Sequence, residues 1–69
     1  MIFRVKYWDK VKLEFNIEYV EINSITDLEN LQNRYQLLEN KTYGEDAWGI
    51  SLIVDCKNNT IIIYNDYME

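Results

Sequence analysis

A segment whose apolar residues have the spacing of a helix face lies between two segments that have the residue patterns of β-strands. This helical stripe repeats apolar residues every three or four positions, which is the spacing of one helix face: Ile25, Leu28, Leu31, Tyr35 and Leu38. Apolar and polar side chains alternate, as in strands that bury one face, over residues 2–8, 11–22 and 48–56. Residues 61–67 begin with three consecutive isoleucines, which put apolar groups on both faces and suggest a central strand or an apolar outer face. The pattern therefore predicts the element order ββαββ.

One helix covers only one side of a four-stranded sheet. We therefore expect an α+β fold of two layers, a mostly antiparallel sheet with the helix on one face. If the first and last strands pair in parallel at the centre, the strand order is 2-1-4-3. This order resembles the β-grasp arrangement of the immunoglobulin-binding domains of protein G, a resemblance of element order over the whole chain that implies no binding residue. Residues 1–69 form one small domain.

The second strand changes phase along its length. Apolar residues occupy its odd positions as far as Tyr19, but Val20 and Ile22 are apolar at even positions. A one-residue slip moves side chains to the opposite face, so we expect a bulge near Tyr19–Val20. With the odd positions facing the helix, the carboxylates of Glu14 and Glu18 project from the outer face.

Two capping patterns precede the helical stripe. Thr26 with Glu29 fits a capping box, and Ser24 with Asp27 is the alternative. The helix should end near residues 39–40.

The inventory of reactive side chains is short. The sequence has no histidine and one cysteine, Cys56. This excludes a His/Cys zinc cage, a Ser-His-Asp triad and a disulfide within the chain. The carboxylates show no calcium-loop pattern. We expect no enzyme activity, no cofactor and no metal site, and an inert buried thiol at Cys56.

Charge is distributed unevenly. The formal net charge is −5, yet residues 1–12 hold four basic residues against one acid. The acidic remainder repels phosphate and suits a protein partner with a basic surface. Arg4, Lys6 and Lys12 beside Trp8 have the composition of a single-strand nucleic-acid site. Because we expect acids on the same face, cross-strand salt pairing is the preferred explanation, and no direct nucleic-acid binding is expected.

Three surface features are candidate contact sites. The first is the set of acidic side chains on the strands and loops after residue 12, for which an ordinary solubilising surface is the alternative. The second is an apolar outer face, where a two-residue turn at residues 58–59 places Ile53 opposite Tyr64 and where Trp8 joins them. The alternatives are a small core covered by a loop of the same chain, and a homodimer face. The third is the loop after the helix, whose Tyr43 either contacts a partner or packs over the helix end. The predicted partner-binding residues are Glu14, Glu18, Tyr43, Glu45, Asp46, Tyr64 and Asp66.

These features favour a small acidic protein-binding inhibitor that occludes a basic surface of a larger protein. Richness in Ile, Asn, Tyr and Lys, residues of A/T-rich codons, suggests a phage or mobile-element product against a host nucleic-acid-handling defence system, such as an anti-CRISPR protein. No run of apolar residues is long enough to span a membrane or form a signal core, so we expect a cytoplasmic protein. The alternatives are an immunity or antitoxin protein, and a homodimeric module that pairs through the outer face or an edge strand.

Overall fold

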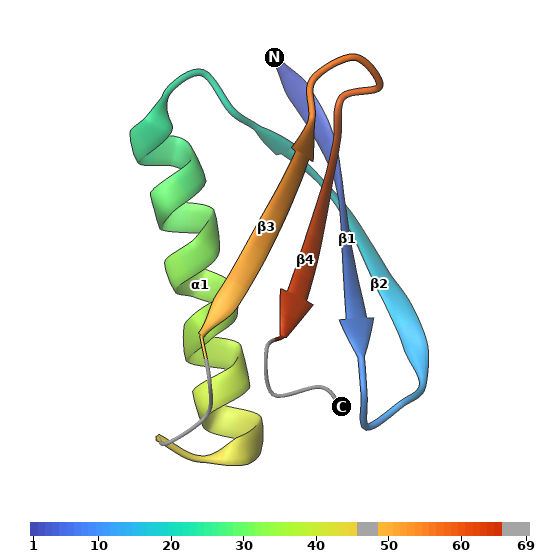
Figure 1. Ribbon diagram of the computed structural model, residues 1–69, viewed down its shortest axis with the longest axis vertical. Helices are drawn as coiled ribbons and strands as arrows, with labels where there is room; N and C mark the ends of the chain where they lie inside the picture. The colour runs from blue at the N-terminus through green and yellow to red at the C-terminus, as the bar shows by residue number, and fades with distance from the viewer. Residues whose placement is uncertain (46–48, 66–69) are drawn as a thin grey trace.

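A computed structural model describes residues 1–45 and 49–65 as one open sheet and one helix. The elements are β1 (Ile2–Asp9), β2 (Glu14–Glu21), α1 (Ile25–Tyr43), β3 (Ile50–Asp55) and β4 (Thr60–Asn65). The strand order is β2-β1-β4-β3, and only the central pair β1 and β4 runs parallel (Figure 1). The predicted α+β fold and strand order are confirmed.

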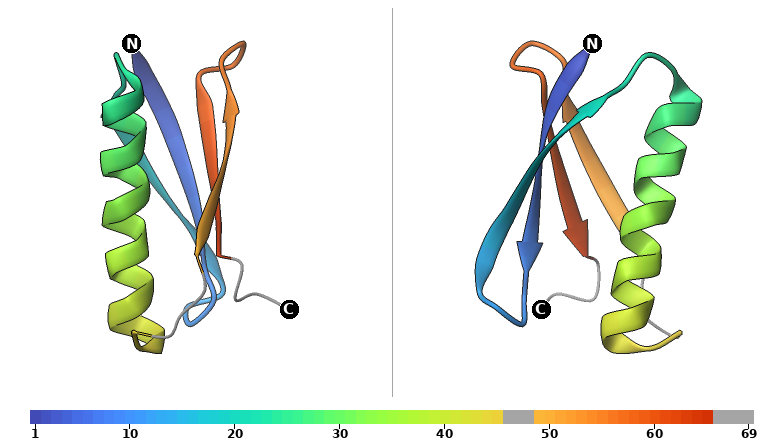
Figure 2. Two further views of the ribbon diagram at one scale, coloured as in Figure 1. Left: turned by 60° about the vertical axis from the view of Figure 1, so that its left-hand side comes forward. Right: turned by 180° about the vertical axis from the view of Figure 1, so that it is seen from behind.

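The helix lies against one face of the sheet and leaves the other face uncovered (Figure 2). The core between the two layers comes mainly from the two central strands, which have neighbours on both sides. Its buried hydrophobic residues are Phe3, Val5, Tyr7, Leu31, Tyr35, Ile50, Ile61 and Ile63. Val5 and Ile61 are each 0% exposed and lie opposite one another in the parallel pair, so they mark the centre of the core.

The pairing of β2 with β1 contradicts the predicted orientation of β2. Val5 lies opposite Glu18 and Lys6 lies opposite Ile17, in a register that runs unbroken from Ile2↔Glu21 to Asp9↔Glu14. Directly opposed residues share a face. The odd positions of β2 therefore point away from the helix, the carboxylates of Glu14 and Glu18 lie on the helix side, and the predicted bulge is absent from the β1–β2 ladder.

Two four-residue turns explain the shifted strand boundaries. In the first, Asp9 Oδ1 accepts hydrogen bonds from the backbone N–H groups of Val11 (2.9 Å) and Lys12 (3.0 Å), so β2 begins at Glu14 and not at residue 11. In the second, residues 56–59 join Asp55 to Thr60, which places Ile53 opposite Ile62 and not opposite Tyr64. Both turns have an even number of residues, as a two-residue turn has, so they change which residues lie opposite one another but not which parities share a face.

The helix begins with the alternative cap. Ser24 is the N-cap, and its Oγ accepts a hydrogen bond from the Asp27 N–H at 3.3 Å. The helix continues to Tyr43, past the predicted end, and stops at Gly44, whose φ of 99° suits glycine best.

The predicted stripe is only partly buried. Ile25 is 74% exposed and Leu38 is 41% exposed, whereas Glu39 is 0% exposed. The buried face of α1 is therefore more polar than the apolar spacing predicted. Cys56, predicted to be buried, is exposed in the β3–β4 turn.

Candidate interaction surface

The sheet surface opposite the helix is rich in exposed apolar side chains, and we call it the outer face. It comprises Arg4, Lys6 and Trp8 of β1, Phe15, Ile17 and Tyr19 of β2, Ile53 of β3, and Ile62 and Tyr64 of β4. Tyr19 is 69% exposed, Phe15 55%, Ile53 51%, Ile17 48% and Tyr64 43%. These values show that the described part of the chain does not cover its own outer face.

The middle of the outer face is hollowed. A depression of about 340 Å³ is lined by side chains of the outer face, among them Lys6, Trp8, Phe15 and Tyr64. The Trp8 and Phe15 rings meet edge to face with centroids 5.0 Å apart, and Lys6 Nζ lies 6.0 Å from the Phe15 centroid. The prediction that Trp8 joins the outer face is confirmed, and the ring contact fixes one wall of the hollow.

The two cations of the outer face lie opposite uncharged residues on both neighbouring strands. Arg4 lies between Tyr19 and Thr60, and Lys6 lies between Ile17 and Ile62. Within residues 1–45 and 49–65, neither cation forms an ion pair. The expected cross-strand pairing with Glu14 and Glu18 is wrong, because these acids lie on the opposite side of the sheet.

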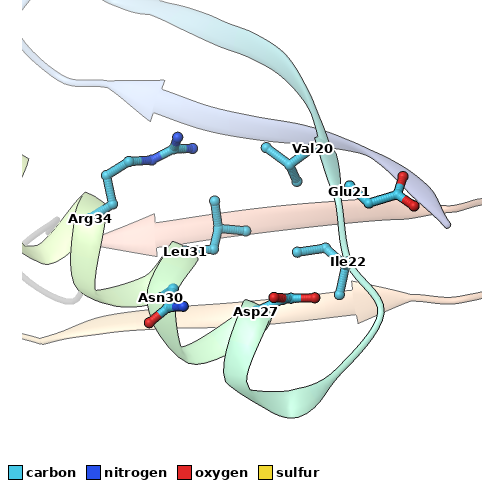
Figure 3. Close-up of a pocket in the computed structure, with 7 residues that line it drawn as sticks. All are labelled: Val20, Glu21, Ile22, Asp27, Asn30, Leu31 and Arg34. Atoms are coloured by element: carbon cyan, nitrogen blue, oxygen red, sulfur yellow. The ribbon is translucent and has the colours of Figure 1, made fainter.

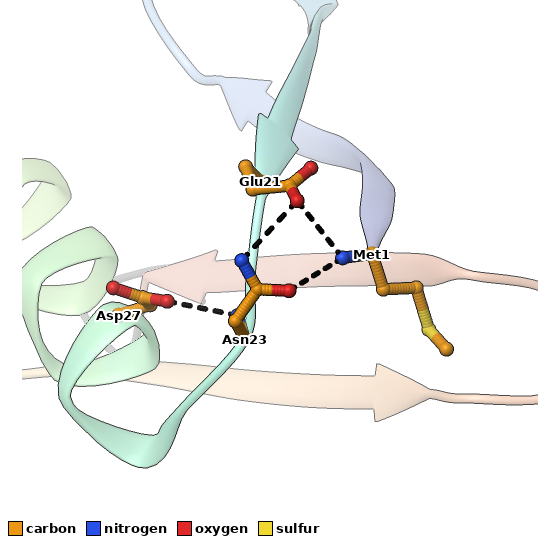
Figure 4. A network of polar contacts seen from close by, with 4 residues as sticks. All are labelled: Met1, Glu21, Asn23 and Asp27. Carbon is orange, nitrogen blue, oxygen red and sulfur yellow. Dashed lines mark hydrogen bonds and ion pairs between the residues drawn. The ribbon is translucent and has the colours of Figure 1, made fainter.

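One acid of the outer face, Glu21, is engaged near the start of β1. Figure 4 shows the Met1 amino group donating to Glu21 Oε1 at 3.1 Å and to Asn23 Oδ1 at 2.6 Å. Asn23 Nδ2 also donates to Glu21 Oε1 at 3.2 Å, and its backbone N–H donates to Asp27 Oδ2 at 2.8 Å. The hydrogen bond from Asn23 and that from the amino group hold the pKa of the Glu21 carboxyl below its usual value. This network joins the start of β1, the end of β2 and the first turn of α1.

The other acid of this face, Asp55, is engaged by its own turn. Its Oδ2 accepts from Asn58 Nδ2 at 2.7 Å, and its Oδ1 accepts from the N–H groups of Lys57 and Asn58. The Asn58 side-chain bond, followed by the backbone bonds, lowers the pKa of Asp55. Both carboxylates therefore lie at one end of the outer face, away from the hollow, and already accept hydrogen bonds.

The acid Glu18, predicted to bind a partner, instead contacts the helix. It accepts a hydrogen bond and an ion pair from Arg34, and a hydrogen bond from the Tyr35 hydroxyl at 2.9 Å. Burial of the Tyr35 ring, with the Glu18 contact second, raises the pKa of Tyr35 to about 12. Glu18 therefore links β2 to α1. Glu14 lies opposite Asp9 on the same side of the sheet and is exposed.

The remaining predicted contact residues do not gather at one site. Tyr43 is half-buried at the last residue of α1, where burial and the nearby Glu39 and Asp9 carboxylates raise the pKa of its hydroxyl. Glu45 is exposed just after the helix, while Asp46 and Asp66 lie outside the described residues. Of the seven predicted positions, Tyr64 is the one that the structure places on the outer face.

The most prominent members of the outer face on β2 were missed by sequence reasoning. Phe15, Ile17 and Tyr19 were expected to face the helix because they are apolar. Hairpin parity was the available signal: a loop with an even number of residues pairs odd positions of one strand with even positions of the other. Since Phe3, Val5 and Tyr7 are the inner residues of β1, the even positions of β2 had to be inner as well.

A second depression lies between β2 and the helix (Figure 3). It has a volume of about 250 Å³, and Val20, Ile22 and Leu31 form its apolar part while Asp27 and Arg34 stand at its rim. Asp27 already accepts from the Asn23 N–H, and Arg34 already bonds Glu18. Its charged groups are thus committed to contacts within the chain, and the outer face is the stronger candidate for binding.

A functional assignment for this chain depends on the surface described above, because the comparisons with known proteins found no family model, no curated protein and no solved structure that matches it. Within the described ranges, no cluster of three or more Cys, Asp or Glu residues is suited to hold a metal ion. The helix, as far as the structure describes the chain, lacks the length of apolar sequence needed to cross a membrane.

Proposed function

We propose that this protein is a non-enzymatic protein-binding domain that covers a surface of a larger protein with its outer face. The observation that carries the proposal is the contiguous set of exposed aromatic and aliphatic side chains around the central hollow. Small soluble domains rarely leave such a patch uncovered unless it binds something. Tyr, Trp and Arg, which the outer face combines, are also the residues most enriched at the energetic centres of protein interfaces.

The mode of action that we propose is occlusion. A sheet face held by a central parallel pair presents its side chains on a rigid frame, and covering a partner's working surface needs no reactive group. The composition supports a phage or mobile-element inhibitor of a host nucleic-acid-handling defence system, acting in the host cytoplasm. The predicted binding of surface acids to a basic partner surface has less support, because the Glu18 carboxylate is engaged by Arg34 and Tyr35.

The test compares two substitutions that make the same chemical change on different faces. Ile53→Lys alters the outer face, and Leu37→Lys alters the exposed side of α1; the two side chains are 51% and 69% exposed. Tagged wild type and both variants are used to retain proteins from nuclease-treated lysate of a low-GC bacterium, and the retained proteins are identified by mass spectrometry.

We expect one stoichiometric protein to be retained by wild type and by Leu37→Lys, and to be lost from Ile53→Lys. Equal retention by all three forms contradicts the proposal, since a partner that tolerates lysine at position 53 does not cover the outer face. Circular dichroism of the three forms checks that each is folded.

A further inference from the structure

We infer that the partner segment that the outer face binds is acidic and apolar: one apolar or aromatic side chain fills the central hollow, and adjacent carboxylates meet Lys6 and Arg4. This inference rests on the proposed function of the outer face and names the chemistry of its partner. It reverses the expectation drawn from net charge, which pointed to a basic partner.

The hollow has the form of an anchor site. It holds about 340 Å³ between the Trp8 and Phe15 rings on one side and Tyr64 on the other, over Ile62. Among its lining side chains, the polar groups are the Lys6 ammonium group, the Trp8 indole N–H and the Tyr64 hydroxyl. A buried apolar side chain in a pocket of this kind contributes most of the binding energy in a typical interface. Lys6 beside the hollow favours a carboxylate close to that side chain in the partner sequence.

The two cations require anionic groups from whatever covers them. Arg4 and Lys6 point to the same side of β1 two residues apart, so their Cα atoms are separated by roughly 7 Å. A partner that buries them without a counter-charge leaves two desolvated cations unpaired, which is strongly unfavourable. Carboxylates supply that counter-charge, and the Arg4 guanidinium matches a carboxylate with two parallel hydrogen bonds.

The chain itself offers these cations little competition. Within residues 1–45 and 49–65, the acids on this side of the sheet are Glu21 and Asp55, which are held by the Met1 amino group, by Asn23 and by the turn around Asn58. Glu18, which sequence reasoning placed beside Lys6, bonds Arg34 across the interior side of the sheet. The positive charge at the centre of the outer face is therefore available to a partner.

Symmetry disfavours a second copy of this chain as the occupant. A twofold dimer brings the same patch of each subunit together. Because Arg4 and Lys6 lie on the central strand β1, a face-to-face dimer places them near the same residues of its mate. Like charges brought together in an interface are strongly unfavourable, and Glu21 and Asp55, which lie at the Arg4 end of this face, already accept hydrogen bonds within the chain.

A single-stranded nucleic acid fits the outer face less well than an acidic protein segment. Three of its apolar members, Ile17, Ile53 and Ile62, present no ring on which a base can stack. A protein segment uses the aliphatic and the aromatic side chains together.

The test selects peptides without assuming a partner. A displayed library of random 12-residue peptides is panned on the immobilised full chain; an extended 12-mer spans about 40 Å, enough for the 32 Å length of the molecule. The enriched consensus peptide is synthesised, and its affinity is measured by fluorescence anisotropy for wild type, Ile53→Lys, Lys6→Glu and Lys41→Glu. Lys41→Glu makes the same charge change on the exposed side of α1. A labelled dT15 oligonucleotide and sedimentation of the free protein complete the set.

We expect a consensus with net negative charge and at least one large apolar residue. Its affinity should fall at least tenfold in Ile53→Lys and in Lys6→Glu, and by less than twofold in Lys41→Glu. A peptide in which lysine replaces the consensus carboxylates should regain affinity for Lys6→Glu.

Failure of the inference and failure of the proposed function give different results. A consensus that needs Ile53 but is neutral or basic, or that binds Lys6→Glu as tightly as wild type, overturns the inference and leaves the proposed function standing. A consensus unaffected by Ile53→Lys contradicts the proposed function as well. Micromolar binding of dT15 that Lys6→Glu abolishes, or a wild-type dimer that Ile53→Lys dissociates, overturns the inference in favour of nucleic acid or of a second copy.

Discussion

Replacing Glu39 with glutamine should stabilise this protein at neutral pH. Glu39 is 0% exposed; its Oε2 accepts a hydrogen bond from Asn65 Nδ2, and its Oε1 has no hydrogen-bond partner among the residues that the structure describes. Glutamine keeps the shape and an oxygen for Asn65, and it removes the buried negative charge. The substitution removes the free-energy cost of burying a carboxylate with one oxygen that lacks a hydrogen bond. It retains the free-energy cost of burying one amide N–H₂ group.

The magnitude follows from that difference. An unsatisfied buried polar group costs about 1–3 kcal/mol, and a charged one costs more. A net gain of about 1 kcal/mol at pH 7 is therefore a conservative expectation for Glu39→Gln. In a domain of this size, about 1 kcal/mol raises the melting temperature by roughly 4–8 °C.

The gain should depend on pH in a defined direction. Burial raises the pKa of the Glu39 carboxyl, against the smaller opposite effect of the Asn65 hydrogen bond. A raised pKa means that the folded state holds its proton more tightly than the unfolded state, so the wild type loses stability as the pH rises from the unfolded pKa, about 4.3, through the folded one. Glu39→Gln escapes this loss, so its advantage should be smallest at low pH and should grow as the pH rises through the folded-state pKa.

Thermal denaturation followed by circular dichroism between pH 4 and 8 measures the effect. Glu29→Gln is the matched control, because it makes the same change at an exposed position of α1. A Glu39→Gln protein that melts below wild type at pH 7, or an advantage that is constant over the pH range, refutes the reasoning.

Two further predictions concern the core and the helix cap. Ile61→Ala should lower the free energy of unfolding by about 2–5 kcal/mol, because Ile61 is 0% exposed. Ile53→Ala on the outer face should change the free energy of unfolding by less than about 0.5 kcal/mol. Urea denaturation measures both values, and equal losses contradict the assignment of faces. Ser24→Ala should cost about 1 kcal/mol through loss of the cap, and Thr26→Ala should cost less; the reverse ranking of melting temperatures shows that Thr26 is the true N-cap.

The element order was predictable because each element carries its own periodicity. The apolar run of β4 indicates a strand with neighbours on both sides, and the single helix determines the layers. The strand order followed only on the condition that the first and last strands pair at the centre, because alternation in β1 is shared by the edge strands. The periodicities are properties of short segments, which local sequence expresses directly.

The facing of β2 was not predictable from hydrophobicity alone, and the candidate site depended on it. Phe15, Ile17 and Tyr19 are as apolar as core residues, and a prediction that buries apolar residues turns them inward. The hairpin geometry sets the opposite orientation, and it moves Glu18 to the helix side. Glu39 was missed for a related reason: a charged side chain near a helix end is usually solvated, and its burial arises from the packing of α1 near the end of β4, which no local pattern reports.

The central pairing of β1 with β4 has a consequence for the order in which the molecule is assembled. The first and last strands of the described chain are neighbours, and the Arg4 N–H bonds the Asn59 carbonyl at 2.8 Å. During synthesis the first hairpin emerges long before β4 is made, and an isolated hairpin is only marginally stable. The nascent chain therefore has to remain without a closed core until β4 has been made. Folding of this sheet should be nearly all-or-none once β4 is available, with its rate limited by this long-range contact.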